Sequence, residues 1–469
     1  MKKILLLLPF FLWTCGGGGG TSSPTEPETS NPPSVENFSL ELNENSSVTF
    51  SFLGSDPNNN TLTYAINSPP LNGSVTINNG NGTYVPNINF SGSDIFSYTA
   101  SSKGGVSNIG TVSIIINPVD NRRIFGISSI SEDNPTEVIL SNDGGFIING
   151  YSSMHPTDGS EYDVLYVIKT DSQGNQLWSK ILGDSNNQNR AMSITTGHDG
   201  GYLIAGANRD ANGSNKKGFI LKIDEYGNTE WFKTYDSPIE PTIIRKTMDG
   251  SYIVGSSTIK VMKIDTSGNE IWNVNLKENF PNPSRNYYLR SLIETSDGGI
   301  AIVSDGHPVS GSNGEDAFLT KIDNNGSFLW IKSFGLNQRY NGFGDIVETS
   351  NNDLIIVGQY NGWTRGGFWL LKTDPDGELI WTNNSAENDP AYQVELSNDN
   401  GYVISVDNDL IKTNSDGNFE WKVYDISEGM IISLKQTTDG GYIISAGITI
   451  NQYPDIQLIK IDSEGNQEF

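Results

Sequence analysis

A ten-residue phrase that recurs seven times constrains the fold of this chain more than any other feature. The phrase reads Lys-x-Asp-x-x-Gly-Asn-x-x-Trp, with some positions varied, and its copies begin at Lys169, Lys222, Lys263, Lys321, Lys372, Lys412 and Lys460. A second phrase, Asp-Gly-Gly-Tyr before two apolar residues, alternates with it, with copies, degraded in two cases, at Asp143, Asp199, Asp249, Asp297, Asp353, Asp399 and Asp439. Self-similar, strand-rich units of about 40–58 residues are typical of radial β-architectures.

One unit shows why the repeat predicts four strands. Residues 191–196, 202–207, 218–224 and 229–235 are short runs with strand-like alternation, and turn residues separate them. In the Asp-x-x-Gly turn, the Asp side chain bonds its own backbone and the Gly takes a positive φ. The Trp falls on the fourth strand, where we expect it to pack against the neighbouring unit.

The ends of the repeat predict how the ring closes. The seventh copy stops at Phe469, where its fourth strand begins, while residues 123–128 resemble a fourth strand without a unit of its own. We therefore expect a seven-bladed β-propeller over residues 121–469, closed by an N-terminal strand, because a closed ring leaves no unpaired sheet edge. A six- or eight-bladed ring and an open solenoid are the alternatives.

Residues 36–120 have another pattern, with short alternating runs between turn clusters, which predicts an immunoglobulin-like antiparallel sandwich in this all-β chain. Its phrases are Gly54-Ser55-Asp56-Pro57, Gly73-Ser74-Val75, Asn89-Phe90-Ser91-Gly92-Ser93-Asp94 and Ile116-Asn117-Pro118-Val119-Asp120. They resemble the cadherin-like, immunoglobulin-type repeat of bacterial surface proteins. The resemblance implies a calcium site at Glu44, Asp56, Asp94 and Asp120, since calcium prefers oxygen ligands. The alternative role for these acids is to cap turns.

The first 35 residues predict export and anchoring. Lys2 and Lys3 precede an apolar run at residues 4–13, which is too short to cross a bilayer core of about 30 Å as a helix. With Cys15 directly after, residues 1–14 resemble a bacterial lipoprotein signal peptide that is cut before a lipidated cysteine. Residues 15–35, rich in Gly, Pro and Ser, would then be a linker to the membrane. An ordinary secretory signal is the alternative.

The propeller repeat resembles two families. Its Asp-x-x-Gly-x-x-x-Trp pattern is similar to the repeat of pyrroloquinoline-quinone dehydrogenases and of the outer-membrane assembly lipoproteins that share their propeller. It also resembles the Asp-box of sialidases. In these families the motif belongs to the scaffold, which implies structural roles for Asp171, Asp224, Asp265, Asp323, Asp374 and Asp462. The resemblances together imply a lipoprotein of the bacterial cell envelope, with the outer membrane as the expected site.

Charge and cysteine content exclude several classes. A net charge of −26 leaves no basic surface for nucleic-acid phosphates. A single cysteine excludes an internal disulfide. A zinc site from His155 and His307 is disfavoured, because no closely spaced third ligand accompanies them. Apart from calcium, no cofactor is expected.

We expect ligands to bind at the face that carries the loops between second and third strands and the connections between blades. Aromatic, Arg and His residues in these segments suit a glycan or protein ligand, and the candidates are Tyr360, Trp363, Arg365, Arg339, Tyr340, His155 and His307. The alternative is that they are scattered surface residues.

The sequence therefore predicts a non-enzymatic, lipid-anchored surface protein, active in adhesion or binding, whose propeller is the binding platform. One alternative is an enzyme, either a quinoprotein or a glycan hydrolase or lyase. A hydrolase needs two facing acids, for which the loop candidates are Glu161, Asp163, Glu315 and Asp316. The other alternative is a scaffold for envelope assembly.

Overall fold

The computed structural model divides into two compact units, Met1–Val119 and Asp120–Phe469. It describes residues 31–43, 46–87, 90, 92–117, 123–127, 131–154, 162–183, 187–210, 216–235, 240–282, 284–307, 316–335, 341–360, 367–384, 389–450 and 453–469. The fold is all-β, as the sequence predicts, and the helical content of the described residues is the short 3-10 turn η1 (Lys277–Asn279). No helix within these ranges is long and apolar enough to cross a bilayer.

The first unit is a sandwich of two sheets. One sheet has the order β2 (Phe38–Asn43), β10 (Gly110–Asn117), β8 (Gly92–Ser102), β5 (Thr63–Ser68), with β9 (Gly105–Val106) beside β8. The other has the order β3 (Val48–Ser51), β7 (Asn81–Pro86), β6 (Gly73–Asn78), and β1 (Ser34–Val35) pairs separately with β4 (Gly54–Ser55). One pairing departs from the expected antiparallel pattern. The first and last long strands of the unit, β2 and β10, lie side by side at one sheet edge and run parallel.

Aromatic rings fill the core of this sandwich. Tyr84, Phe96 and Tyr98 are buried among aliphatic side chains of both sheets. The phenol of Tyr98 donates to the carbonyl oxygens of Glu36 (2.7 Å) and Leu53 (2.9 Å), so its burial leaves no unmet polar group. Packing therefore holds the two sheets together without a disulfide, and the Tyr84 hydroxyl of β7 adds a hydrogen bond to Asp94 of β8 (2.8 Å).

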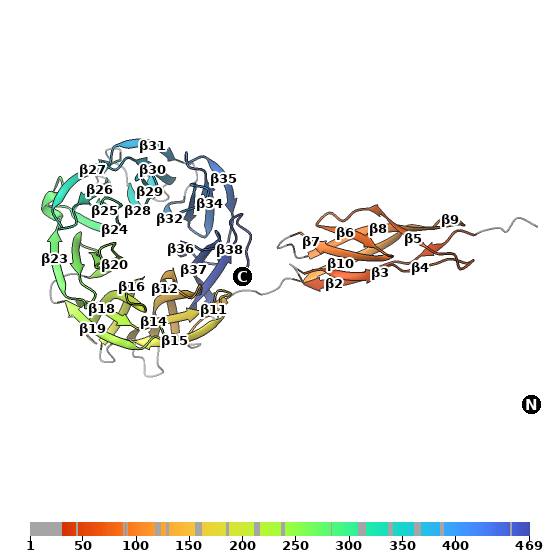
Figure 1. Ribbon diagram of the computed structural model, residues 1–469, viewed down its shortest axis with the longest axis horizontal. Coiled ribbons are helices and arrows are strands. Elements are labelled where there is room, and N and C mark those ends of the chain that lie inside the picture. The colour runs from red at the N-terminus through yellow and green to blue at the C-terminus, as the bar shows by residue number, and fades with distance from the viewer. Residues whose placement is uncertain are drawn as a thin grey trace, which may run out of the picture. The chain divides into compact units, whose positions relative to one another are not determined.

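The second unit contains seven antiparallel four-stranded sheets, which stand around a common axis and which we number blades 1 to 7 (Figure 1). Blade 1 is β12 (Ser131–Leu140), β13 (Phe146–Met154), β14 (Tyr162–Thr170) and β15 (Gln176–Leu182). Blade 2 is β16 (Asn187–Thr196), β17 (Tyr202–Asp210), β18 (Lys216–Ile223) and β19 (Thr229–Tyr235). Blade 3 is β20 (Pro241–Lys246), β21 (Tyr252–Ser256), β22 (Lys260–Ile264) and β23 (Glu270–Asn275).

The remaining blades repeat this order. Blade 4 is β24 (Asn286–Glu294), β25 (Ile300–His307), β26 (Asp316–Ile322) and β27 (Phe328–Phe334). Blade 5 is β28 (Gly342–Glu348), β29 (Leu354–Tyr360), β30 (Gly367–Thr373) and β31 (Leu379–Asn384). Blade 6 is β32 (Ala391–Leu396), β33 (Tyr402–Val406), β34 (Asp409–Thr413) and β35 (Phe419–Val423). Blade 7 is β36 (Ile431–Gln436), β37 (Tyr442–Ile450), β38 (Tyr453–Ile461) and β11 (Arg123–Phe125).

The predicted pairing of an N-terminal strand with the last sheet is observed. In β11, Ile124 lies opposite Gln457 of β38. The start of the same outer strand comes from the other end of the sequence, because Lys460 N donates to Phe469 O (2.9 Å) and Glu468 N donates to Lys460 O (2.7 Å). The Arg123 guanidinium lies 5.2 Å from the centre of the Phe469 ring. Two distant segments thus complete one strand of blade 7.

The Asp of the ten-residue phrase organises its own turn. Asp171 Oδ1 accepts hydrogen bonds from Gln173 N (2.9 Å) and Asn175 N (2.8 Å), and Gly174 has φ +75°. In blade 6, Asn414 takes the place of Asp and accepts the two corresponding bonds. An amide oxygen performs this task as well as a carboxylate does, which confirms a structural role for the motif.

The same glycine also receives the aromatic side chain of the preceding blade. A Cβ atom built on Gly227 of blade 2 would lie 2.9 Å from Trp178 of blade 1. The corresponding pairs around the ring are Trp231–Gly268, Trp272–Gly326, Trp330–Gly377, Trp381–Gly417, Trp421–Gly465 and Phe469–Gly174. The Trp therefore packs against the neighbouring unit, as predicted, and the last pair joins blade 7 to blade 1.

An ion pair between a largely buried Lys and a more exposed Asp connects the two repeated phrases in every blade. Each Lys on the third strand meets an Asp of the turn between the first two strands, at 2.5–3.0 Å, in the pairs Lys169–Asp143, Lys222–Asp199, Lys263–Asp249, Lys321–Asp297, Lys372–Asp353, Lys412–Asp399 and Lys460–Asp439. The Lys side chains are only 2–16% exposed. Because an unpaired charge there is costly, this pair fixes the turn to the third strand.

Candidate ligand-binding site at the propeller axis

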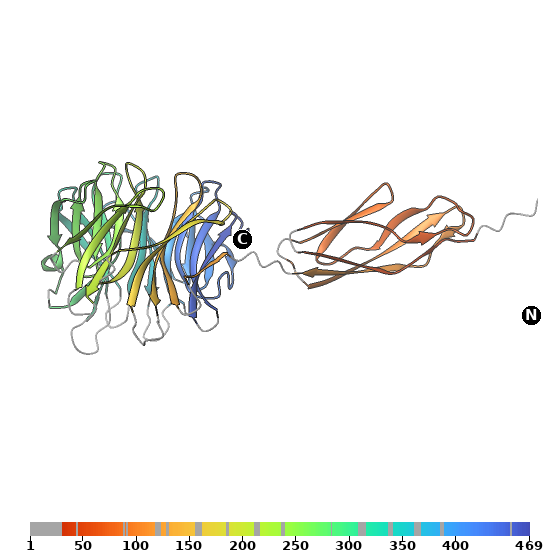
Figure 2. The same cartoon turned by 90° about the horizontal axis from the view of Figure 1, so that it is seen from below.

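The antiparallel order of each blade places its turns at two opposite faces of the ring. The Asp-Gly-Gly and Asp-x-x-Gly turns share one face, which we call the turn face, because the Lys–Asp pairs join them. The second strands end, and the third strands begin, at the other face, which we call the loop face (Figure 2). The first strands lie innermost, around the axis (Figure 1).

Every innermost strand carries a register shift at the same place in its blade. The extra residues are Thr136, Met192, Thr242, Arg290, Gly344, Tyr392 and Ile432. Such bulges bend a strand and redirect its side chains. Side chains at and beside these bulges, from all seven blades, line an axial cavity of about 120 Å³.

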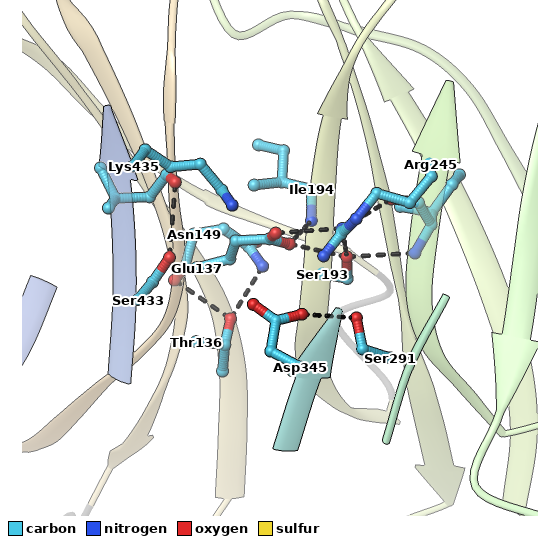
Figure 3. Close-up of polar contacts among 12 residues, drawn as sticks. Thr136, Glu137, Asn149, Ser193, Ile194, Arg245, Ser291, Asp345, Ser433 and Lys435 are labelled. Atoms are coloured by element: carbon cyan, nitrogen blue, oxygen red, sulfur yellow. Dashed lines mark hydrogen bonds and ion pairs between the residues drawn. The ribbon is translucent and has the colours of Figure 1, made fainter. Parts of the chain in front are cut away.

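A polar network surrounds this axial cavity (Figure 3). Glu137 of blade 1 accepts hydrogen bonds from Ser193 Oγ (2.7 Å) and Ile194 N (2.9 Å) of blade 2. Its other carboxylate oxygen lies 3.0 Å from Arg245 Nη1 of blade 3. One buried carboxylate therefore links three successive blades.

Blades 4 to 7 are joined in a similar way. Asp345 accepts hydrogen bonds from Ser291 Oγ (2.7 Å) on one side and from Val394 N (3.2 Å) on the other. Lys435 of blade 7 forms an ion pair with Glu395 of blade 6. Burial alone lowers the pKa of Lys435, but the Glu395 and Asp345 carboxylates outweigh it and raise that pKa. These groups satisfy one another, so we assign them to holding the blades rather than to chemistry.

A larger cavity of about 340 Å³ opens beside the axis between blades 4 and 7, and we call it the mouth pocket. It shares the lining residues Arg290, Gly344 and Gln393 with the axial cavity, so the two spaces are adjacent. Arg290 Nε and Nη2 donate to the two oxygens of Asp305, at 2.7 and 2.8 Å. The Asp305 side chain is buried, whereas that of Arg290 is 46% exposed. The pocket thus contains a rigidly held, partly accessible guanidinium group.

Glycine and apolar residues shape the rest of the mouth pocket. A Cβ atom on Gly344 would lie 2.8 Å from Tyr392 O, so glycine at this bulge lets blade 6 approach blade 5 closely. Tyr392 and Met430 of the lining are 37% and 42% exposed, and Phe343 of the lining is buried. The amides of Gln359 and Gln393 complete the polar part of the lining. This combination can bind a ligand that has both apolar and hydroxyl surfaces.

The ligand-face residues predicted from the sequence are not among the described residues that line the mouth pocket. Tyr360 ends β29, and its ring packs 5.6 Å from that of Trp369, in the core between blades 4 and 5. His307 ends β25, but its side chain is outside the description. The other candidates lie outside the described residues, namely Trp363, Arg365, Arg339, Tyr340, His155 and the anchor residue Cys15.

The loop acids considered for hydrolysis are engaged with arginines where they are described. Asp163 accepts from Ser153 Oγ (2.7 Å) and pairs with Arg190. Asp316 pairs with Arg285 at 2.7 Å. Glu161 and Glu315 lie outside the described residues.

Two of the four acids of the expected calcium site in the sandwich, Asp56 and Asp94, are among the described residues. Asp56 accepts bonds from Asn58 N (2.8 Å) and from Ser102 Oγ (2.5 Å). Asp94 accepts bonds from Leu71 N (3.1 Å) and Tyr84 OH (2.8 Å), while Glu44 and Asp120 lie outside the described residues. Within the described ranges, no three His, Cys, Asp or Glu side chains gather as metal ligands. The calcium site in the sandwich stays a prediction.

Sequence reasoning missed the mouth pocket. Its residues Arg290, Tyr392 and Met430 lie on or next to innermost strands, whereas the prediction concentrated on loops. An alignment of the seven first-strand sequences would have shown one unusual position. At the bulge, blade 5 has Gly344 where the other blades carry larger side chains.

Comparisons with known proteins match one family model and several solved structures. The family model described as Bacterial Ig domain matches residues 30–115. No curated protein matches the chain. Among solved structures, virginiamycin B lyase from Staphylococcus aureus is similar, with 13% identity, a TM-score of 0.47, and coverage of 71% of this chain and 95% of the lyase.

Two further structures are similar. BamB from Moraxella catarrhalis has 11% identity and a TM-score of 0.39, over 71% of this chain and 99% of BamB. The extracellular domain of a putative hybrid two-component system from B. thetaiotaomicron has 12% identity and a TM-score of 0.49, over 80% of this chain and 46% of that one. The chain thus combines a segment that matches the Bacterial Ig domain with an all-β unit of propeller-like blades.

Proposed function

We propose that this chain is a binding protein of the bacterial envelope, and that its propeller binds an uncharged glycan in the mouth pocket. The observation that carries the proposal is that one pocket is lined both by the partly exposed Tyr392 and by the hydrogen-bonded Arg290–Asp305 pair. An aromatic face suits the apolar side of a sugar ring, and charged or amide groups suit its hydroxyls. Since the guanidinium and carboxylate neutralise each other in an acidic protein, a neutral ligand is favoured over an anionic one.

The pocket lining supports binding rather than hydrolysis. Among its described residues the one carboxylate is Asp305, and both of its oxygens accept hydrogen bonds from Arg290. Glycoside hydrolysis by the common route needs two carboxyl groups across the scissile bond, about 5–10 Å apart. A proton-donating acid is thus missing from the described lining, and the proposed role is recognition without turnover.

Glycan binding by this pocket is tested with a glycan array and then calorimetry on the purified protein. We expect Tyr392→Ala to weaken binding at least about tenfold, because loss of a central aromatic contact costs on the order of 1.4 kcal/mol or more. Tyr226→Ala is the control, since Tyr226 is an exposed tyrosine of the turn face. Unchanged affinity in Tyr392→Ala, or a partner that proves to be a protein, would contradict the assignment.

The envelope location rests on the Bacterial Ig match at residues 30–115 and on the N-terminal sequence. We further propose that Cys15 carries the lipid anchor and that residues 15–35 tether the folded units to the outer membrane. One acyl chain binds a membrane only weakly, so a durable anchor requires more than one. Fractionation tests this: the Cys15→Ser variant is expected in the soluble fraction, and persistence in the membrane fraction would exclude the anchor.

A further inference from the structure

Two carboxylates meet where the chain passes from the closing strand β11 to blade 1. Asp455 lies on β38 of blade 7, opposite Ile448, and Asp133 lies on β12 of blade 1, opposite Ser152. Both side chains converge beside Gly126. A Cβ atom built on this glycine would collide with Asp455 Oδ1 and would lie 3.1 Å from Asp133 Oδ2. The acid pair thus lies at the contact between the last blade and the first.

The Asp133 carboxylate is fully buried and only half satisfied. Its Oδ2 accepts hydrogen bonds from Ile127 N (2.8 Å) and Ser131 Oγ (3.1 Å). Its Oδ1 is buried without a hydrogen-bond partner. Burial, and then the neighbouring Asp133, raise the pKa of Asp455. Two carboxylates in this position repel each other unless a positive species lies between them.

Other contacts between blades show that the fold does not require a charge here. Asp133 lies three residues before Thr136, the extra residue of the bulge in blade 1. Asn189 and Asn341 lie three residues before the corresponding bulge residues of blades 2 and 5, so the three positions are equivalent. Each contacts the glycine of the crossing segment, since a Cβ atom on Gly183 would lie 2.7 Å from Asn189 Cγ. The corresponding distance from Gly335 to Asn341 Nδ2 is also 2.7 Å.

A neutral amide therefore suffices at two equivalent contacts. What a carboxylate pair adds is the capacity to bind a positive species, either a cation or a shared proton. Calcium prefers hard oxygen ligands and is available outside the cell. The Asp133 and Asp455 carboxylates supply such oxygens side by side at Gly126, and Asp133 Oδ1 has no other hydrogen-bond partner. Asp455 is only partly buried, which leaves access for water.

We propose that Asp133 and Asp455 form a calcium site that joins blade 7 to blade 1. Water molecules complete the six to eight oxygen ligands that calcium takes. The described residues contribute two acidic side chains, not three, to this site. We therefore expect weak binding, with a Kd of about 10⁻⁴–10⁻³ M, as in extracellular modules. This site is distinct from the acids of the sandwich and does not depend on the proposed glycan binding.

The site is tested by thermal unfolding of the full chain in EGTA and in 10 mM calcium chloride. Because the ion binds the closed ring only, we expect calcium to raise the wild-type Tm by about 2–4 °C. Asp133→Asn and Asp455→Asn should abolish this rise. In EGTA, Asp133→Asn should melt at or above the wild-type temperature, since it copies Asn189 and Asn341. Asp171→Asn, which copies the tolerated Asn414, is the control that keeps the response.

Either of two outcomes would overturn the proposal. A calcium response that survives in both Asn variants would place the ion elsewhere. A wild-type Tm that calcium does not change would exclude the ion, and a shared proton would then be shown by a wild-type stability that falls as pH rises through the raised pKa of Asp455. Tyr166 is a further titratable group near the pair, so Tyr166→Phe must leave that pH profile unchanged for the proton interpretation to hold.

Discussion

Replacing Phe125 with alanine is expected to lower the free energy of unfolding of the propeller by about 3–5 kcal/mol. Phe125 is buried at the contact between blades 7 and 1, in one core cluster with Ile456, Leu458 and Tyr166. It belongs to a strand of three residues that is held to its blade by pairing and packing alone. Urea unfolding, followed by tryptophan fluorescence, measures the change.

Leu182→Ala is the matched control for this variant. Leu182 pairs with Leu165 in blade 1 as Phe125 pairs with Ile456 in blade 7, but its strand is continuous with the rest of its blade. Leu182 is also only partly buried, so a loss of about 1–2 kcal/mol is expected. If Phe125→Ala cost no more than Leu182→Ala, β11 would not be the element that closes the ring.

Asp143→Ala is expected to cost about 2–3 kcal/mol, and more than the same change at Asp399. Lys169 is buried, and its described partners are Asp143 and the carbonyl of Thr170, so the variant leaves a buried ammonium group without an anion. In blade 6, Lys412 keeps Glu420 at 2.7 Å when Asp399 is removed. We therefore expect Asp399→Ala to cost about 1 kcal/mol, and equal costs would refute the pairing argument.

The same pairs determine the response to acid. Burial alone raises the pKa of Asp143, but Lys169, Ser141 and the Gly145 N–H outweigh it and lower the pKa to about 2. Asp297, Asp399 and Asp439 have the same lowered value of about 2. Because an unfolded Asp titrates near pH 3.9, this stabilisation is present above about pH 4 and is lost as pH falls towards 2.

Circular dichroism at a series of pH values measures this loss. The carboxylates are half exposed, so salt reduces each contribution and the acid transition should shift with ionic strength. Asp143→Ala should show a shallower dependence than wild type between pH 4 and 2. A wild-type stability that stays constant over that range would show that the seven pairs contribute little.

The scaffold could be predicted because its determinants are local and repeated. Asp171 and Gly174 form a turn within four residues, and the glycine recurs in every blade, with Asn414 in place of the Asp in blade 6. The Lys–Asp link was also within reach. In blade 5 the turn glycines are lost and Asn351 takes the place of the Asp, but Asp353, at the position of the second glycine, supplies the carboxylate that pairs with Lys372. The pairing is thus kept although the motif that signals it has changed.

The partners between blades could be predicted only in part. The sequence indicates that the Trp packs against a neighbouring unit, but not that its partner is the turn glycine of the next blade. Tyr360 ends β29 and its ring packs on Trp369 of the adjacent strand, a contact that the sequence does not indicate, and its place at a ligand face stays a prediction. Exposure of a side chain at a strand end depends on its cross-strand neighbours, which sequence position alone does not give.

The mouth pocket and the acid pair arise from tertiary structure. Arg290, Tyr392 and Met430 belong to three different blades and come together only around the closed axis. Asp133 and Asp455 lie near opposite ends of the propeller sequence and meet only if blade 7 contacts blade 1. No local pattern marks such residues, because their roles depend on ring closure rather than on the repeat.

Ring closure is tested most directly by a disulfide across its contact. Ile124→Cys and Gln457→Cys, in a Cys15→Ser background, place two thiols on residues that lie directly opposite in β11 and β38. On mild oxidation of the monomer we expect one intramolecular disulfide, seen as faster migration on a non-reducing gel and as a higher Tm. Ile124→Cys with Thr234→Cys of blade 2 should stay reduced. Two free thiols in the first variant after oxidation would contradict the closed ring.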